Sequence, residues 1–173
     1  MKLRTLWFIL ATGGLLLVLA GLKTLTKPSQ ASLENPAPPF QLAALDGGLT
    51  SLSDYKGKVV LLNFWATWCP SCVTEMPALE SLHIRHKERG FTVVGVSVDQ
   101  DGRKVVVPFV ASRGLSFPFL LANSRTERDY GVYGLPASFL IDAQGVMRRR
   151  YIGEVDPKKV ENDILQLLDG KKS

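Results

Sequence analysis

The sequence predicts an α/β fold in which a mixed central sheet is flanked by helices. Two apolar runs, residues 59–65 and 92–98, have the length and the β-branched composition of strands buried on both faces. Between them, apolar side chains recur every three residues after Cys69, as expected of a helix. A hairpin and a capped helix close the chain, so that strands and helices follow one another as in layered α/β proteins.

An extension precedes the first of these strands. Residues 40–50 contain the turn Asp46-Gly47-Gly48 between two apolar stretches, which indicates an N-terminal β-hairpin with glycines at positive φ. A short turn or helical stub follows at 53–57. The helix after Cys69 is expected to end at Gly90, because glycine readily adopts the left-handed conformation found at helix ends.

The second half of the chain is predicted to complete the sheet. Asp156 caps the last helix because its carboxylate can accept the free N–H groups of a helix N-terminus, and Pro157 suits the first helical position. The other expected elements are a helix at 103–113 bent at Pro108, a strand at 119–122, a helix at 126–130 and an antiparallel hairpin of 138–141 and 146–152.

Length and charge exclude several classes of protein. The chain has 173 residues, enough for one domain and an appendage, and a mild net charge of +5. Two basic clusters, Arg148-Arg149-Arg150 and Lys171-Lys172, are interpreted as solvated surface. The sequence contains no basic stripe interleaved with aromatic residues, so nucleic acid is not expected as a partner.

The first residues differ in kind from the rest. Residues 5–22 carry no charge and are flanked on both sides by basic residues. This length is at the threshold for a membrane-spanning helix, which needs about 20 apolar residues. The stretch lacks the small-residue ending of a cleavable signal peptide, so an uncleaved signal-anchor at 1–23 is favoured over cleavage.

Residues 24–39 are polar and contain several prolines, and we interpret them as an extended linker to a domain at 40–173. Positively charged flanks of a membrane helix tend to stay in the cytoplasm, but here basic residues flank the apolar stretch on both sides. Their numbers are nearly equal, so this rule gives almost no preference for either orientation. The short N-terminal tail is the part easily left in the cytoplasm. The domain would then face the periplasm or the outer side of a Gram-positive membrane.

The chain contains only two cysteines, in the run Trp68-Cys69-Pro70-Ser71-Cys72. With no third thiol in the sequence, this pair can close a small disulfide ring and open it again. Cys69 falls where a buried strand has ended and a helix begins, and Pro70 suits the first helical position. Free N–H groups and the helix dipole favour a thiolate there. We therefore expect Cys69 to be the exposed attacking thiol and Cys72 the resolving thiol.

Zinc binding and inert burial are the competing interpretations of the cysteine pair. His83 and His86 follow it, but the gap is shorter than in zinc fingers. In a continuous helix His83 would lie roughly 16 Å along the axis from Cys72, so four ligands could not meet at one ion. Both histidines are expected to face solvent, and no metal is expected.

Two parts of the sequence carry a family resemblance. One is 63–72 followed by Glu75-Met76-Pro77, and the other is 131–136 followed by Phe139-Leu140-Ile141-Asp142 and Gly145. They resemble the membrane-anchored thioredoxin-like reductases of the TlpA, ResA and CcmG (DsbE) type. The resemblance extends from about residue 40 to near residue 168. It implies a thioredoxin-like fold with an N-terminal β-hairpin extension and a central insertion.

The resemblance also implies an activity and its partners. Such proteins are thiol–disulfide oxidoreductases that reduce protein disulfides outside the cytoplasm, above all the haem-attachment cysteines of apocytochrome c. Electrons would come from a transmembrane thiol carrier of the CcdA or DsbD type. The redox centre is the cysteine pair itself, so no cofactor is expected. Some members instead serve copper-site assembly in cytochrome oxidase.

Several single residues acquire expected roles in this way. Pro136 matches the cis-proline that faces the cysteine pair, and the backbone of Leu135 would pair with a substrate strand. Glu75 shares a helix face with Cys72, and spacing alone leaves a surface acid and a proton carrier equally open. The reductases carry a glutamate here, which favours the proton carrier. The residues expected to support the site and to contact the partner are Trp68, Pro70 and Ser71.

Asn63 departs from cytoplasmic thioredoxin, which has a buried aspartate at that place. Asparagine cannot carry a proton, which leaves Glu75 as the candidate. Two other functions are less well supported by the sequence. Copper chaperones of this fold typically have Cys-x3-Cys and a distant histidine, whereas no histidine follows His86. Thiol peroxidases usually have Pro-x3-Thr-x2-Cys, and here Leu62 and Ala66 occupy the proline and threonine positions.

Overall fold

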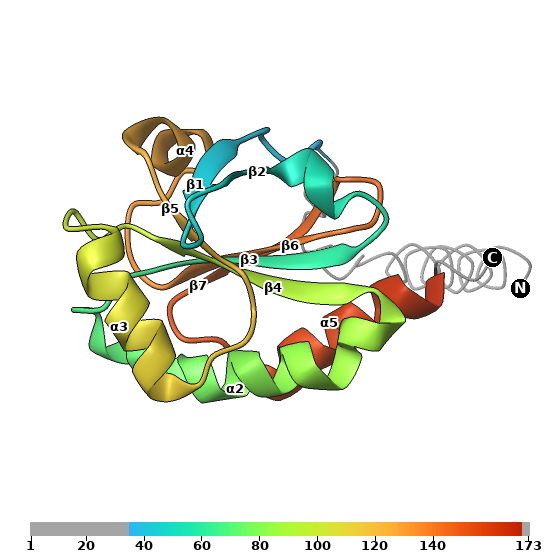
Figure 1. Ribbon diagram of the computed structural model, residues 1–173. Coiled ribbons are helices and arrows are strands. Elements are labelled where there is room, and N and C mark those ends of the chain that lie inside the picture. The colour runs from blue at the N-terminus through green and yellow to red at the C-terminus, as the bar shows by residue number, and fades with distance from the viewer. Residues whose placement is uncertain (1–34, 171–173) are drawn as a thin grey trace, which may run out of the picture. The chain divides into compact units, whose positions relative to one another are not determined.

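Residues 35–170, which the computed structural model describes, form a mixed seven-stranded sheet with helices packed on it (Figure 1). The strands are β1 (Gln41–Ala44), β2 (Leu49–Ser51), β3 (Val59–Trp65), β4 (Phe91–Ser97), β5 (Phe119–Leu121), β6 (Ala137–Ile141) and β7 (Met147–Ile152). Their order across the sheet is β2-β1-β5-β4-β3-β6-β7. β3, β4 and β5 are parallel neighbours, and the remaining pairs are antiparallel. The predicted mixed α/β class is confirmed.

The helices divide between the two faces of the sheet. They are α2 (Pro70–His86), α3 (Arg103–Arg113), α4 (Ser124–Asp129) and α5 (Pro157–Gly170), with 3-10 turns η1 (Leu52–Tyr55) and η2 (Lys87–Arg89). α2, α3 and α5 lie below the sheet in Figure 1 and share one hydrophobic core with it. α4 and η1 lie on the opposite side, and the β1–β2 hairpin forms one edge of the sheet.

β3 lies in the middle of the sheet and is buried along its whole length, as its apolar run predicts. Successive side chains of a strand point to opposite faces. Leu61 and Trp65 belong to the core under α2, whereas Leu62 and Phe64 belong to the opposite core. Asn63 therefore points to the face that α2 covers. Each large apolar side chain contributes about 1.5–3 kcal/mol by leaving water, so this strand is firmly held.

The helix predicted at 126–130 begins earlier, at Ser124, because the side chain of Asn123 caps it by accepting the Thr126 N–H. The other predicted helix boundaries depend on local signals and are confirmed. Pro70 is the first residue of α2, and Pro77 lies inside the helix. The helix ends at His86 and continues as the η2 turn to Gly90, whose φ of 90° is the expected left-handed conformation. At α5, the side chain of Asp156 accepts a hydrogen bond from the Lys158 N–H at 3.0 Å. In the β1–β2 hairpin, a positive φ occurs at Gly47 and not at Gly48.

Residues 35–39, the end of the expected linker, are hydrogen-bonded to the sheet. The N–H of Ala37 donates to the Gly145 carbonyl at 2.9 Å, and the Tyr130 hydroxyl donates to the Pro38 carbonyl at 2.8 Å. The expected anchor at 1–23 and residues 24–34 lie outside the described residues. Between residues 35 and 170, none of the helices has the length and apolar character that crossing a membrane requires.

The two histidines of α2 correct the sequence analysis, because both are buried rather than solvent-facing. His83 is 9% exposed and His86 is 5% exposed. His86 Nε2 lies 2.8 Å from Glu161 Oε1 on α5, and His83 Nδ1 accepts the Val93 N–H at 3.4 Å. Burial lowers the pKa of His83, which keeps its ring neutral. His83 and His86 each follow an apolar residue, Leu79 and Leu82, by four positions, so both lie on the face of α2 that packs against β4 and α5.

The His86–Glu161 contact yields a first prediction. Replacing Glu161 by alanine leaves the ring of His86 buried without this partner, so the free energy of unfolding should fall by about 1–2 kcal/mol. Denaturant unfolding of the full chain measures this. Asn162→Ala, an exposed neighbour on the same helix, is the control. Equal losses in the two variants would show that the contact contributes nothing.

Candidate active site

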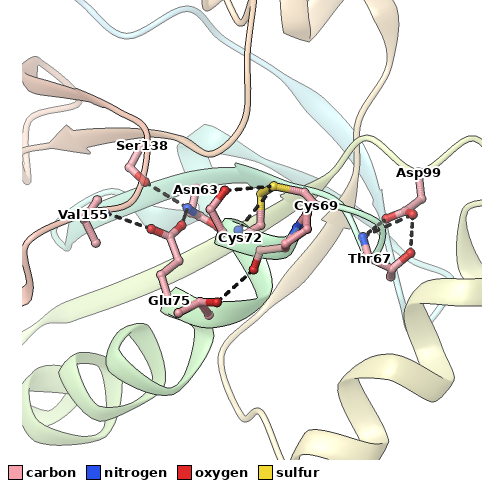
Figure 2. Close-up of a disulfide and its surroundings, with 11 residues drawn as sticks. Asn63, Thr67, Cys69, Cys72, Glu75, Asp99, Ser138 and Val155 are labelled. Atoms are coloured by element: carbon pink, nitrogen blue, oxygen red, sulfur yellow. Dashed lines mark hydrogen bonds between the residues drawn. A yellow bond between two sulfur atoms is a disulfide. The ribbon is translucent and has the colours of Figure 1, made fainter.

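The redox pair lies where β3 passes into α2. Cys69 is the N-cap residue of α2, with an extended backbone (φ −94°, ψ 107°), and Pro70 follows as the first helical residue. Cys69 and Cys72 form a disulfide (Figure 2). The backbone N–H of Cys72 also donates to Cys69 Sγ at 3.3 Å. A thiolate formed at Cys69 in the reduced protein would face this N–H and the positive end of the helix dipole.

The exposure of Cys69 corrects the sequence analysis. Only 5% of Cys69 is exposed, and Cys72 is fully buried at 0%. As the N-cap residue, Cys69 turns its side chain back over the first helical turn, where its sulfur is bonded to the buried Cys72. Cys69 is nevertheless the more accessible of the two sulfurs, as expected, because Cys69 lines a groove on the surface and Cys72 does not.

An open groove runs past Cys69. Two exposed aromatic side chains stand beside it, Trp68 at 68% exposure and Tyr133 at 92%. The Leu135–Pro136 peptide bond is cis, as the resemblance implies, and Leu135 borders the groove. The residues that line the groove are Trp68, Cys69, Pro70, Ser71, Val98, Gln100, Glu127, Val132, Tyr133, Gly134 and Leu135. An extended segment of a partner could thus reach Cys69 from the surface.

Glu75 is buried below the disulfide and is not a surface acid. It is 2% exposed, and its Oε1 accepts the Asn63 Nδ2–H at 2.8 Å while its Oε2 accepts the Val155 N–H at 3.0 Å (Figure 2). Burial raises the pKa of Glu75, the two hydrogen bonds oppose that shift, and repulsion from Glu154 adds to it. The site therefore contains an acid that holds its proton more tightly than an ordinary glutamate.

Asp99 is a site residue that the sequence analysis missed. Its carboxylate accepts the Thr67 N–H at 3.0 Å and the Thr67 hydroxyl at 2.6 Å (Figure 2). It also accepts the Ser97 hydroxyl at 2.8 Å. Thr67 belongs to the short loop between β3 and Cys69. Asp99 follows β4, the parallel neighbour of β3, and the carboxyl ends of parallel strands meet at one edge of the sheet. That topological rule is the signal that could have found it.

Known proteins with similar sequences are named as thiol-disulfide oxidoreductases, in agreement with a cysteine pair at a helix N-terminus. Residues 33–150 match the AhpC/TSA family. The chain belongs to this family. Among curated relatives, thiol-disulfide oxidoreductase ResA from Bacillus anthracis is 39% identical over 128 residues, 72% of each chain. Thioredoxin-like protein YneN from Bacillus subtilis (strain 168) is 36% identical over 129 residues, 74% of this chain and 76% of its own.

Solved structures of the same kind share the fold. The crystal structure of a putative thiol:disulfide interchange protein DsbE from Chlorobium tepidum superposes with a TM-score of 0.73 at 35% identity. It covers 78% of this chain and 96% of its own. The fold of this AhpC/TSA member is thus thioredoxin-like, as expected. It is a thiol–disulfide oxidoreductase of the TlpA, ResA and CcmG type.

The role of Asp99 yields a second prediction. Asp99→Ala removes the acceptor that holds Thr67, so the loop before Cys69 should become mobile and the free energy of unfolding should fall by about 2 kcal/mol. Thiol–disulfide exchange with a small disulfide should slow as well. Denaturant unfolding and stopped-flow exchange measure the two effects. Asp101→Ala, an exposed residue of the same loop, is the control and should behave like the wild type.

The pKa of Glu75 yields a third prediction. An acid whose pKa is higher in the folded than in the unfolded protein binds its proton more tightly when folded. The free energy of unfolding should therefore decrease as pH rises from the unfolded value, 4.5, through the folded pKa. Glu75→Gln should abolish this decrease. Denaturant unfolding of the oxidised chain across this pH range tests it, with the exposed Glu88→Gln as control. An unchanged pH profile in Glu75→Gln would contradict the assignment.

Proposed function

We propose that this oxidoreductase reduces protein disulfides outside the cytoplasm, and that its substrates are the haem-attachment cysteines of apocytochrome c. The observation that supports this most directly is the placement of Cys69 at a helix N-terminus, beside an open groove and above a buried carboxyl group. The names of the relatives, ResA and DsbE, support the same class of reaction.

The first step is attack by Cys69. Its thiolate attacks one sulfur of the partner disulfide, so that a Cys69–partner bond forms as the partner's own S–S bond breaks. The second partner sulfur leaves as a thiolate and takes a proton. The low exposure of Cys69 means that the partner disulfide must enter the groove, where the backbone of Leu135 can pair with the partner segment.

The second step is resolution by Cys72. The Glu75 carboxylate accepts the proton of the Cys72 thiol, and the resulting thiolate attacks Cys69 in the mixed disulfide. The Cys69–Cys72 bond forms, the bond to the partner breaks, and the partner leaves with both cysteines reduced. Two electrons have moved from this chain to the partner. A transmembrane thiol carrier of the CcdA or DsbD type would restore the reduced pair.

The proposed location is the outer side of the cell membrane, with residues 1–23 as an uncleaved anchor and 24–39 as linker. A match to ResA from Geobacillus thermodenitrificans supports a common N-terminal region, since it covers 171 residues and 95% of each chain at 33% identity. A match of that extent must include most of residues 1–34. A cysteine pair that cycles through a disulfide suits such a compartment.

The test is reduction of a peptide that carries an oxidised Cys-x-x-Cys-His segment. The reduced full chain should convert it to the dithiol, and Glu75→Gln should slow the second step about 100-fold by removing the proton acceptor. Thiol trapping and mass spectrometry measure both. No reduction of the peptide, together with a redox midpoint as oxidising as that of a disulfide-forming enzyme, would overturn the proposal.

Resolution by Cys72 yields a fourth prediction. In Cys72→Ser the first step proceeds but the second cannot, so a covalent adduct between Cys69 and its partner should accumulate. Non-reducing electrophoresis of membranes expressing the variant detects the adduct. Cys69→Ser is the matched control and should trap far less partner, because Cys72 is fully buried. More trapping by Cys69→Ser than by Cys72→Ser would reverse the assigned order of the thiols, and equal trapping would contradict it.

A further inference from the structure

Asn63, Glu75 and Ser138 form a buried hydrogen-bonded cluster. The exchange of disulfides described above gives a role to Glu75 but none to Asn63 or Ser138. Asn63 and Ser138 are 0% exposed, and Glu75 is 2% exposed. Asn63 Nδ2 donates to both of its neighbours, to Glu75 Oε1 at 2.8 Å and to Ser138 Oγ at 2.9 Å (Figure 2). The register of the sheet places Asn63 on β3 directly opposite Ser138 on β6.

Both oxygens of the Glu75 carboxylate face N–H donors. Oε1 faces the amide of Asn63, and Oε2 faces the backbone N–H of Val155 at 3.0 Å. This arrangement suits the ionised carboxylate, which can only accept hydrogen bonds. A protonated Glu75 carries an O–H donor, which neither N–H group can accept. The backbone of Val155 cannot become an acceptor there, whereas the Asn63 amide can, by half a turn about its Cβ–Cγ bond.

The remaining amide atom of Asn63 fits such a turn. Its Oδ1 is buried and has no hydrogen-bond partner within residues 35–170. After the half turn Oδ1 would face both Glu75 and Ser138, and the hydroxyl of Ser138 can donate as well as accept. Each orientation then makes two hydrogen bonds and leaves one end of the amide without a partner. The proton on Glu75 therefore decides which orientation has the lower free energy.

We propose that Asn63 is a positioning residue for the proton on Glu75, and that its amide turns over when Glu75 is protonated while Ser138 changes from acceptor to donor. This inference rests on the proposed role of Glu75 as proton acceptor for Cys72. In that step a proton passes from the Cys72 thiol to Glu75 and no electron moves. The turned amide gives the new O–H group an acceptor inside the protein, so the proton stays on Glu75 while the thiolate reacts.

Few titratable groups lie near Glu75, and this determines the conditions of the test. Glu154, in the loop before α5, is the neighbouring charge that acts on Glu75. Cys72, on α2, titrates only when the disulfide is reduced. The strands β3 and β6 contribute the uncharged Asn63 and Ser138. In the oxidised chain Glu75 therefore titrates without the thiols, and the turn of the amide can be followed by itself.

The first experiment is an NMR titration of the oxidised full chain in detergent micelles. The carboxyl carbon of Glu75 reports its protonation, and nuclear Overhauser effects report the distance from the Asn63 NH2 protons to the β-protons of Ser138. We expect these effects to be present above the midpoint of Glu75 and lost below it, with the same midpoint. Effects that persist unchanged on both sides of the midpoint would overturn the proposal, and this measurement needs no variant.

The second experiment removes the amide itself. An amide that turns hydrogen-bonds Glu75 in both its ionised and its protonated form, so Asn63→Leu should change the measured pKa of Glu75 by less than about 0.5. An amide fixed with its NH2 group toward Glu75 stabilises only the ionised form, and its loss would raise the pKa by about 1 or more. Thr92→Val, which removes a buried hydroxyl on β4 outside the cluster, is the control. A rise of about 1 or more in Asn63→Leu would contradict the proposal.

Neither experiment involves a substrate, so their outcome is independent of the peptide-reduction test. A chain that reduces the peptide with a fixed Asn63 amide would refute only this inference. A chain in which the amide turns but no peptide is reduced would refute only the proposed substrate.

Discussion

The site depends on a fully buried strand that ends at the first turn of a helix. β3 is paired with β4 on one side and β6 on the other and is buried on both faces, so its end cannot shift without disturbing the sheet. The loop that follows carries Cys69 directly to the N-terminus of α2. The position of the reactive sulfur thus follows from sheet packing, and its reactivity follows from helix geometry.

The same strand also explains the buried carboxyl group. Asn63 interrupts the apolar run of β3 on the face that α2 covers, and there it meets Glu75. An ionised carboxylate withdrawn from water is unstable unless it is hydrogen-bonded, and Asn63 and the Val155 N–H supply those bonds. Burial nevertheless raises the pKa of Glu75. One polar residue in an apolar strand therefore tunes an acid that lies one helical turn beyond Cys72.

The surroundings of the disulfide combine buried sulfur atoms with exposed aromatic side chains. Cys69 is 5% exposed, whereas Trp68 next to it and Tyr133 across the groove project into solvent. Little of the Cys69 surface is therefore accessible to small solutes. A partner that covers the aromatic side chains would remove their apolar area from water, which makes binding more favourable. The bound partner could then place its disulfide next to Cys69. The groove thus suits a partner large enough to cover both aromatic side chains.

Much of the fold follows from signals between near neighbours in the chain. The apolar run of β3, the left-handed Gly90 and the Asp156 cap each depend on a few consecutive residues, and each was predictable. The spacing of Cys69 and Cys72 likewise sufficed to predict a redox pair at a helix N-terminus. These features involve backbone geometry and short-range hydrogen bonds, which do not depend on what packs elsewhere.

Burial could not be predicted in this way. Val155 reaches Glu75 across 80 residues of sequence, Ser138 reaches Asn63 across 75, and Asp99 reaches Thr67 across 32. Helical spacing left Glu75 undecided between surface acid and proton carrier, and only the packing of β3 and the α5 loop against α2 excluded the surface position. By itself the sequence determined that the two cysteines pair and at which end of which helix they lie. The tertiary structure decided which polar groups leave water, because desolvation depends on every element packed around a side chain and not on its neighbours along the chain.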